Sequence, residues 1–270
     1  MTLDDTGFAK LNLALHLRGK LDDGRHRLET IFAFCADGDH LSARLADDIS
    51  LSIEGPFATA LGPAEDNLVL RAARMLRAEA GVSFGAHISL IKVLPVASGI
   101  GGGSADAAAA LRILGRLWSL EEAHARRIAP MLGSDVPACL LSRPSRGTQG
   151  GEVLEPLAPQ DGPLGGNAVL LVNPLIPLPT GPVFAGWDGL DRGPLQDWRA
   201  GRNDLEAPAT RLVPEIASIL DWLRQQQGAE IVRMSGSGAT CFALFANTEA
   251  RDAAASSTPS AWWRLPTHLR

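Results

Sequence analysis

The stretch "PVASGIGGGSADAAAAL", residues 95–111, is the most informative segment of this chain. Gly99 and the three consecutive glycines 101–103 follow a predicted strand, "HISLIKVLP" (87–95), and lead directly into a predicted helix. Glycines lack a Cβ, so backbone N–H groups can approach a ligand closely, and a helix N-terminus adds partial positive charge. The stretch therefore favours a phosphate-binding loop over a glycine-rich connection without a ligand.

Two common nucleotide-binding loops do not match this segment. No Gly-Lys-Ser/Thr follows the glycines, as a Walker loop would require. A Rossmann fingerprint fits poorly, because the loop lies in mid-chain and Ser104 occupies the third glycine position. We therefore expect a nucleoside triphosphate site of a different kind, in which Ser104 can reach a phosphate oxygen or its Mg²⁺.

The N-terminal stretch "FAKLNLALHL" (8–17) alternates leucines with Lys10, Asn12 and His16, as in a strand with one polar face. Phosphoryl transfer needs positioning, charge stabilisation and a group that accepts the proton of the attacking hydroxyl. Lys10 is a candidate for charge stabilisation. For His16 we expect a partly buried ring without a chemical role.

Asp135 in "LGSDVPACL" (132–140) is the candidate proton acceptor. It lies in an otherwise apolar segment, and we expect Pro137 to end any helix there. Spacing alone favours this role and an exposed aspartate at a helix end equally.

The composition is that of a soluble globular protein, with 270 residues, 46% hydrophobic and 20% charged. A net charge of −5 argues against nucleic acid binding. The three cysteines are isolated and odd in number, which predicts reduced core thiols in the cytoplasm. The N-terminus has acids where a signal peptide is basic, and prolines and glycines interrupt the uncharged stretch 163–187. We expect no membrane segment.

Strands and helices mix in both halves without regular βαβ alternation, which predicts an α+β fold in two parts with a seam near residues 143–160. We place the domains at 1–152 and 153–270. One predicted helix, 66–81, has Asp66 as its N-cap and Gly81 as its stop signal. Another opens with a Ser119–Glu122 capping box.

The glycine-rich segment resembles the central phosphate loop of the GHMP kinases, the superfamily of galactokinase, homoserine kinase and mevalonate kinase. Further segments follow in the order and spacing of one branch, which acts on a cytidine-diphosphate-linked methylerythritol. These segments are "AKLNLALHLRGKLDDGRHRLETIF" (9–32), "EDNLVLRAARML" (65–76), "LGSDVPACL" (132–140), "GRNDLEAPA" (201–209) and "RMSGSGATCFALF" (233–245). The similarity extends over nearly the whole chain.

The resemblance implies a two-domain α+β GHMP kinase fold with the active site in the inter-domain cleft. It implies transfer of a phosphoryl group from ATP to the 2-hydroxyl of the methylerythritol unit, in non-mevalonate isoprenoid precursor biosynthesis. Mg²⁺ would be held mainly by the nucleotide phosphates, without a dedicated protein metal site. A small substrate with a cytidine diphosphate moiety is the only partner implied.

The resemblance also assigns candidate site residues. Lys10 and Asp135 match the catalytic pair. The ATP-binding residues would be Pro95, Val96, Ala97, Ser98, Gly99, Ile100, Gly101, Gly102, Gly103 and Ser104, with Asn67 and Lys92 near the adenine. The substrate-binding residues would be Asn12, Arg25, His26, Thr180 and Phe184.

Arg25 is a departure, because the family usually has Gly-Tyr-His where this chain has "GRH" (24–26), and the chain contains no tyrosine. Its guanidinium could stack on cytosine opposite Phe184, pair with the diphosphate, or point into water. Two alternatives to the implied function remain: another GHMP kinase for a small alcohol, and a catalytically inactive nucleotide-binding relative.

Overall fold

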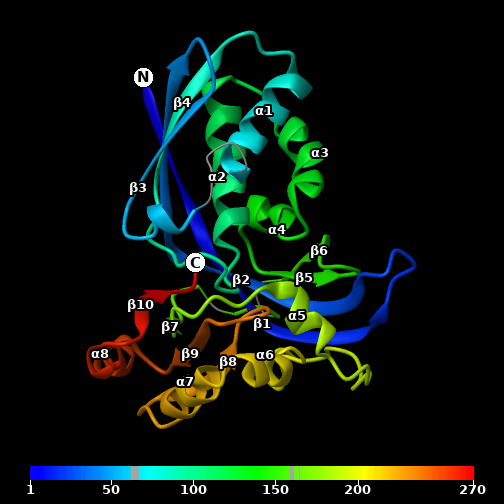
Figure 1. Cartoon of the computed structure of the whole chain (residues 1–270), viewed down its shortest axis with the longest axis vertical. Helices are drawn as coiled ribbons and strands as arrows, with labels where there is room; N and C mark the ends of the chain where they lie inside the picture. The colour runs from blue at the N-terminus through cyan, green and yellow to red at the C-terminus, as the bar shows by residue number, and fades with distance from the viewer. Residues whose placement is uncertain (62–66, 159–160, 164) are drawn as a thin grey trace. The chain divides into compact units, whose positions relative to one another are not determined.

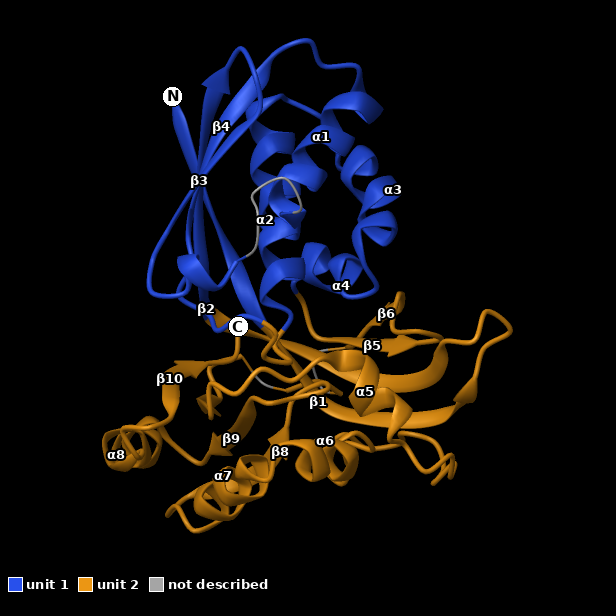
Figure 2. Ribbon diagram, in the orientation of Figure 1, with its two compact units in different colours: residues 1–9, 37–96, 101–142 blue, residues 10–36, 97–100, 143–270 orange. Residues whose placement is uncertain are grey.

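The structure, a computed structural model, describes residues 1–61, 67–158, 161–163 and 165–270 (Figure 1). The chain forms two compact units (Figure 2). Unit 1 comprises residues 1–9, 37–96 and 101–142, and unit 2 comprises 10–36, 97–100 and 143–270. Each unit is assembled from separate segments of the chain. The division into domains 1–152 and 153–270 stays a prediction.

Two long strands contribute residues to both units: β1 (Thr2–Lys20) and β2 (His26–Ala46). They pair with each other. In unit 1, residues 40–46 of β2 pair antiparallel with β4 (Gly85–Ile91), and β4 pairs parallel with β3 (Ser50–Glu54). These pairings give unit 1 a mixed sheet.

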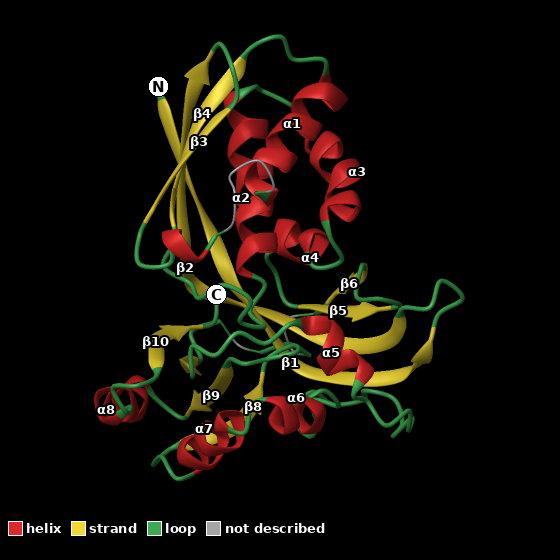
Figure 3. Cartoon of the chain, in the orientation of Figure 1, coloured by secondary structure: helices red, strands yellow, loops and turns green. Residues whose placement is uncertain are grey.

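Four helices of unit 1 lie together beside these strands (Figure 3). They are α1 (Leu68–Ala80), α2 (Gly102–Leu117), α3 (Glu122–Leu132) and α4 (Val136–Leu141). A short 3₁₀ helix, η1 (Ala58–Ala60), also belongs to this unit. The first half of α2 buries a run of alanines, whose small side chains allow neighbouring helices to approach closely.

The helix ends confirm one sequence signal and correct two. Gly81 ends α1 in the left-handed conformation, with φ +65°, as predicted. The side chain of Asn67 caps the start of α1, whereas Asp66 lies outside the described residues. The Ser119 capping box is wrong, because α3 begins after Glu121 without a side-chain cap and Ser119 has φ +54°. Pro137 stands in the first turn of α4 and opens this helix, since its missing N–H is not needed there.

Unit 2 contains a four-stranded antiparallel sheet in the order β10-β7-β9-β8. Its strands are β7 (Ala168–Asn173), β8 (Ala229–Met234), β9 (Cys241–Phe245) and β10 (Trp263–His268). Two further strands, β5 (Ser145–Thr148) and β6 (Val153–Pro156), extend from residues 30–32 of β2. The unit's helices are α5 (Thr180–Ala185), α6 (Glu206–Leu212), α7 (Glu215–Arg224) and α8 (Thr248–Ser257).

The core of unit 2 follows from the pattern of α7. This helix buries Ile216, Ile219, Leu220 and Leu223, which recur every three or four residues and so share one face. The same hydrophobic cluster contains side chains of β7 and β9. The three cysteines are buried and form no disulfide among the described residues, as expected of core thiols. Among the described residues, no helix has the length and apolar character needed to cross a membrane.

Candidate active site

The glycine loop, residues 95–104, ends in the first turn of α2. Gly101 is the N-cap of this helix, with φ +65°, a conformation that favours glycine. The N–H of Ala105 donates to the Gly101 carbonyl at 2.8 Å. The amides of Gly102, Gly103 and Ser104 precede this bond, in the turn where backbone donors have no partner within the helix. No acidic residue stands in this turn, so it suits an anion such as phosphate.

The middle of the glycine loop is held within unit 2 by a second glycine-rich segment, residues 235–240, which we term the second glycine loop. The Ser235 hydroxyl donates to the Gly99 carbonyl at 3.0 Å, and the Thr240 N–H donates to the Ser98 carbonyl at 3.0 Å. Gly99 has φ +77°, and a Cβ there would lie 2.5 Å from the Ser235 carbonyl oxygen. Only glycine fits at this position.

Lys10 lies beside the glycine loop, and its backbone N–H donates to the Ile100 carbonyl at 2.9 Å. Its ammonium donates to the Asn12 carboxamide oxygen at 2.7 Å. The Asn12 amide nitrogen donates to the Thr30 hydroxyl at 2.8 Å, and this hydroxyl donates to the Ala14 carbonyl at 2.6 Å. Lys10, Asn12 and Thr30 are all buried. This chain of hydrogen bonds orients the ammonium, and the strand's predicted polar face is as buried as its leucine face.

Asp135, the predicted proton acceptor, occupies the N-cap position of α4 and is half-buried. Its carbonyl accepts a hydrogen bond from the Cys139 N–H at 3.0 Å, while its carboxylate does not cap the helix. Asp135 belongs to unit 1 and Lys10 to unit 2, and each is described within its own unit. Their joint catalytic role stays a prediction.

An aromatic cluster of unit 2 contains two of the predicted substrate residues, His26 and Phe184. Their ring centroids are 5.1 Å apart, and the Trp187 ring contacts the His26 ring edge-on at 5.6 Å. Burial, and the nearby charge of Lys20, lower the pKa of His26, so its ring is neutral at physiological pH. The sequence reasoning missed Trp187, although its spacing of three residues from Phe184 is a signal for a shared side of the chain.

Besides Asn12, described above, the remaining predicted substrate residues are Thr180 and Arg25, which make different contacts. Thr180 lies 3.1 Å from Ser237, hydroxyl to hydroxyl. The Arg25 guanidinium is half exposed and donates to Asp23 at 2.7 Å and to Glu152 at 3.2 Å. Two carboxylates therefore hold Arg25, and the group that faces Phe184 is the His26 ring rather than the Arg25 guanidinium.

Asn67 and Lys92, expected near adenine, have partners within unit 1. Asn67 accepts from the Val69 N–H at 2.8 Å through its side chain, which caps α1. Lys92 is 1% exposed and is bound by Asp39 and Asp106. Contact of either side chain with a nucleotide stays a prediction.

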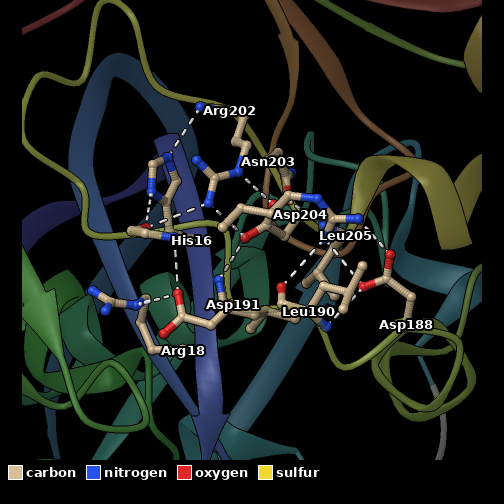
Figure 4. A network of polar contacts seen from close by, with 12 residues as sticks. His16, Arg18, Asp188, Leu190, Asp191, Arg202, Asn203, Asp204 and Leu205 are labelled. Atoms are coloured by element: carbon tan, nitrogen blue, oxygen red, sulfur yellow. Dashed lines mark hydrogen bonds and ion pairs between the residues drawn. The ribbon is translucent and has the colours of Figure 1, made fainter.

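His16 belongs to a network that binds the segment 188–204, between α5 and α6, to β1 (Figure 4). Its Nε2 accepts from the Arg202 N–H at 3.3 Å, so Nδ1 carries the proton and donates to the Gly193 carbonyl at 3.2 Å. Burial, with the nearby charge of Arg202, lowers the pKa of His16. His16 is more buried than the partly buried ring that we expected, and these contacts give it a structural part.

The "GRNDLEAPA" motif contributes to the same network. Asp204 accepts from the Leu17 N–H of β1 at 2.8 Å. Asn203 donates to the carbonyls of Met234 and Gly236, both at 2.8 Å. The motif therefore supports the second glycine loop and β1.

No group of three or more His, Cys, Asp or Glu side chains suited to a metal ion occurs in the part of the chain that the structure describes. The first turn of α2 offers backbone amides to the predicted phosphate site. These donors suit an anion rather than a bare cation.

The fold agrees with the comparisons to known proteins. Residues 67–143 match the family "GHMP kinases N terminal domain", and residues 190–262 match "GHMP kinases C terminal". A crystal structure of homoserine kinase from Cytophaga hutchinsonii superposes with a TM-score of 0.72 at 15% identity, covering 100% of this chain and 96% of that chain. The fold is that of the GHMP kinases, and the predicted α+β class is confirmed.

More similar proteins narrow this class. A 4-diphosphocytidyl-2-C-methyl-D-erythritol kinase of Rhizorhabdus wittichii is 51% identical, covering 98% of this chain and 94% of its own length. The kinase of the same name from Novosphingobium aromaticivorans is 50% identical, covering 100% of this chain and 94% of its own length. A crystal structure of 4-(cytidine 5'-diphospho)-2C-methyl-D-erythritol kinase gives a TM-score of 0.82 at 32% identity, covering 99% of both chains. The chain belongs to the family of these 4-diphosphocytidyl-2-C-methyl-D-erythritol kinases.

Proposed function

We propose that this protein phosphorylates the 2-hydroxyl of 4-diphosphocytidyl-2-C-methyl-D-erythritol with ATP, giving the 2-phosphate and ADP. The observation that carries this proposal is the identity of about half of all residues with kinases of that name over nearly the whole chain. The reaction would belong to non-mevalonate isoprenoid precursor biosynthesis. It requires no nucleic acid, membrane or protein partner, and we place it in the cytoplasm.

The glycine loop is the proposed site for the ATP phosphates. The amides of the first turn of α2 would donate to phosphate oxygens, and the N-terminal end of the helix would stabilise their negative charge. Mg²⁺, held mainly by the nucleotide phosphates with Ser104 in reach, would neutralise part of that charge. The hydrogen bonds from Ser235 and Thr240 would keep the loop in a binding-competent conformation before ATP arrives.

Lys10 and Asp135 are the proposed catalytic residues. Asp135 would accept the proton of the substrate's 2-hydroxyl as that oxygen forms its bond to the γ-phosphorus. The bond from the γ-phosphorus to the bridging oxygen breaks in the same transfer, and ADP leaves. Lys10, oriented by Asn12, would stabilise charge that develops on the transferred group.

The aromatic cluster is the proposed site for the cytosine base. A neutral imidazole can both donate and accept a hydrogen bond, which suits the amide-like edge of cytosine. Phe184 and Trp187 would add stacking area, and Thr180 would lie at the border of the site. This arrangement supports recognition of the base without the tyrosine that the family usually has.

A coupled ADP-release assay across a panel of acceptors tests the proposal. The panel contains the cytidylylated substrate, 2-C-methyl-D-erythritol 4-phosphate, homoserine and mevalonate, and ³¹P NMR identifies the phosphorylated position. We expect kcat/KM at least about 100-fold higher for the cytidylylated substrate, because base recognition adds several favourable contacts. Lys10→Ala and Asp135→Asn serve as inactive controls of retained fold.

Two results would contradict the proposal. Equal or better turnover of an acceptor without the cytidylyl group would indicate another GHMP small-molecule kinase. Binding of ATP without turnover of any acceptor would indicate an inactive nucleotide-binding relative.

A further inference from the structure

Lys92 follows β4 directly and carries its ammonium into the interior of unit 1. The ammonium contacts two buried carboxyl groups, those of Asp39 in β2 and Asp106 in α2. The distance from the ammonium to the Asp106 carboxylate is 2.8 Å. These three residues, which we term the buried triad, are only 0–3% exposed.

The buried triad connects the two ends of the glycine loop. The second oxygen of Asp39 accepts from the N–H groups of Val93 and Leu94, at 2.6 and 2.9 Å, where the chain approaches the loop. Asp106 lies one turn into α2, where the chain leaves the loop. Lys92 thus joins a carboxylate bound to the entry of the loop with a carboxylate on its exit.

Glycine 102 shows how closely the triad approaches the phosphate-binding turn. A Cβ placed on Gly102 would lie 3.0 Å from the Lys92 ammonium nitrogen. The positive charge of Lys92 therefore lies close to Gly102, the first residue of α2. Lys92 can influence the position of this turn even though its ammonium is fully engaged inside the unit.

The electrostatics of the buried triad are costly, because one ammonium and two carboxyl groups lie out of water. Burial raises the pKa of Asp106 to about 8; Lys92 opposes this shift and the Asp39 carboxylate adds to it. Burial alone would lower the pKa of Lys92, but Asp106 and Asp39 outweigh it and raise that pKa. One Asp106 oxygen is buried, and no described residue forms a hydrogen bond to it. Well-packed apolar residues often replace such a buried ion pair without loss of stability, so stability alone does not account for the triad.

We propose that Lys92 is a positioning residue for nucleotide binding: through Asp39 and Asp106 it sets the first turn of α2 against the entry of the glycine loop. In this arrangement Lys92 acts on ATP through the loop backbone and does not contact the adenine. The proposal rests on the proposed function in taking the glycine loop as the ATP site.

The sharpest test removes the connection to α2 and leaves the Lys92–Asp39 pair intact. Lys92→Met would leave the buried carboxyl groups of Asp39 and Asp106 without their ammonium partner and is prone to unfold, so Asp106→Ala and Asp106→Asn are the informative variants. The asparagine keeps an oxygen that accepts from Lys92, whereas the alanine does not. Arg112→Met is the matched control, because Arg112 lies on the same helix and binds Asp5 and the Thr6 carbonyl instead.

Calorimetric titration with ADP, steady-state kinetics and thermal melts are measured on all variants. We expect Asp106→Ala to weaken ADP binding and raise the KM for ATP about tenfold, as loss of one charged hydrogen bond would. The KM of the acceptor should change less than about twofold, because the substitution weakens binding of the nucleotide and not of the acceptor. Asp106→Asn should bind ADP with an affinity within about threefold of the wild-type value, since the asparagine oxygen still accepts a hydrogen bond from Lys92.

Arg112→Met should lower Tm and keep the wild-type ADP affinity. If Asp106→Ala keeps that affinity, or if Arg112→Met weakens ADP binding as much for the same loss of Tm, the positioning role is overturned. ADP binding needs no acceptor, so failure of the proposed function appears separately. Wild-type protein that binds ADP but leaves the cytidylylated acceptor unphosphorylated would contradict that function alone.

Discussion

The ammonium of Lys10 and the carboxamide oxygen of Asn12 are 2.7 Å apart, two positions apart on the same side of β1. Both side chains are buried, and the Asn12 amide nitrogen is in turn bound to Thr30. A lysine side chain has many rotamers, so a fixed acceptor restricts where its charge lies. Asn12, expected to line the acceptor site, thus also orients the candidate catalytic lysine.

The first prediction concerns this orientation. Asn12→Ala should lower kcat about 10- to 100-fold, because a misplaced ammonium stabilises the transition state less well. The KM for ATP should stay nearly constant. Thr30→Val, which keeps the shape but removes the acceptor of the Asn12 amide, should give a smaller decrease in the same direction. Single-turnover rates measure both. A raised acceptor KM with unchanged kcat would instead assign Asn12 to substrate binding alone.

The second prediction compares two glycines of the glycine loop. Gly99→Ala should reduce soluble folded protein and abolish ADP binding, because the Cβ would meet backbone oxygens of Ser235 and Gly238 at 2.5 and 2.6 Å. Gly103→Ala should fold normally, since among the described residues its Cβ would contact only Leu68, at 3.6 Å, and alanine favours a helix by about 1 kcal/mol. Thermal melts and ADP calorimetry distinguish the pair. Equal behaviour of the two variants would contradict the assigned loop geometry.

The third prediction concerns base recognition. Arg25→Ala should change the acceptor KM less than about threefold, because exposed ion pairs contribute little and Arg25 already has Asp23 and Glu152 as partners. Phe184→Ala should raise the same KM about 10- to 100-fold, as loss of one stacking ring would. Steady-state kinetics with varied acceptor provide the comparison. A larger effect at Arg25 than at Phe184 would mean that the guanidinium leaves its carboxylates to bind the substrate.

The fourth prediction is a pH dependence of stability from Asp106. Its pKa is about 8 in the folded protein against an ordinary 3.8, so the folded state keeps a proton that the unfolded chain loses between these values. The free energy of unfolding should therefore fall as pH rises through this window, by up to about 1.4 kcal/mol per pH unit from this group. Asp106→Asn removes the titration and should flatten the slope. Urea unfolding of both proteins at several pH values gives the slopes, and parallel curves would contradict the prediction.

Local patterns in the sequence were sufficient for several features of the site. The glycines before α2, the alternation of 8–17 and the stop signal at Gly81 depend on backbone freedom and side-chain periodicity, which neighbouring residues determine. The resemblance of ordered motifs then identified the family over nearly the whole chain, and the comparisons confirm it. The prediction that Pro137 ends a helix was wrong, because proline can open a helix as well as end one.

The partners of the charged and aromatic side chains were decided only by the tertiary structure. Lys92 meets Asp39 from 53 positions away and Asp106 from 14, and Arg25 meets Glu152 from 127. His26, and not Arg25, faces Phe184. Periodicity predicts which side of an element is buried, but it carries no information about which distant side chain lies opposite. That choice follows from packing and from the need of each buried charge for a partner.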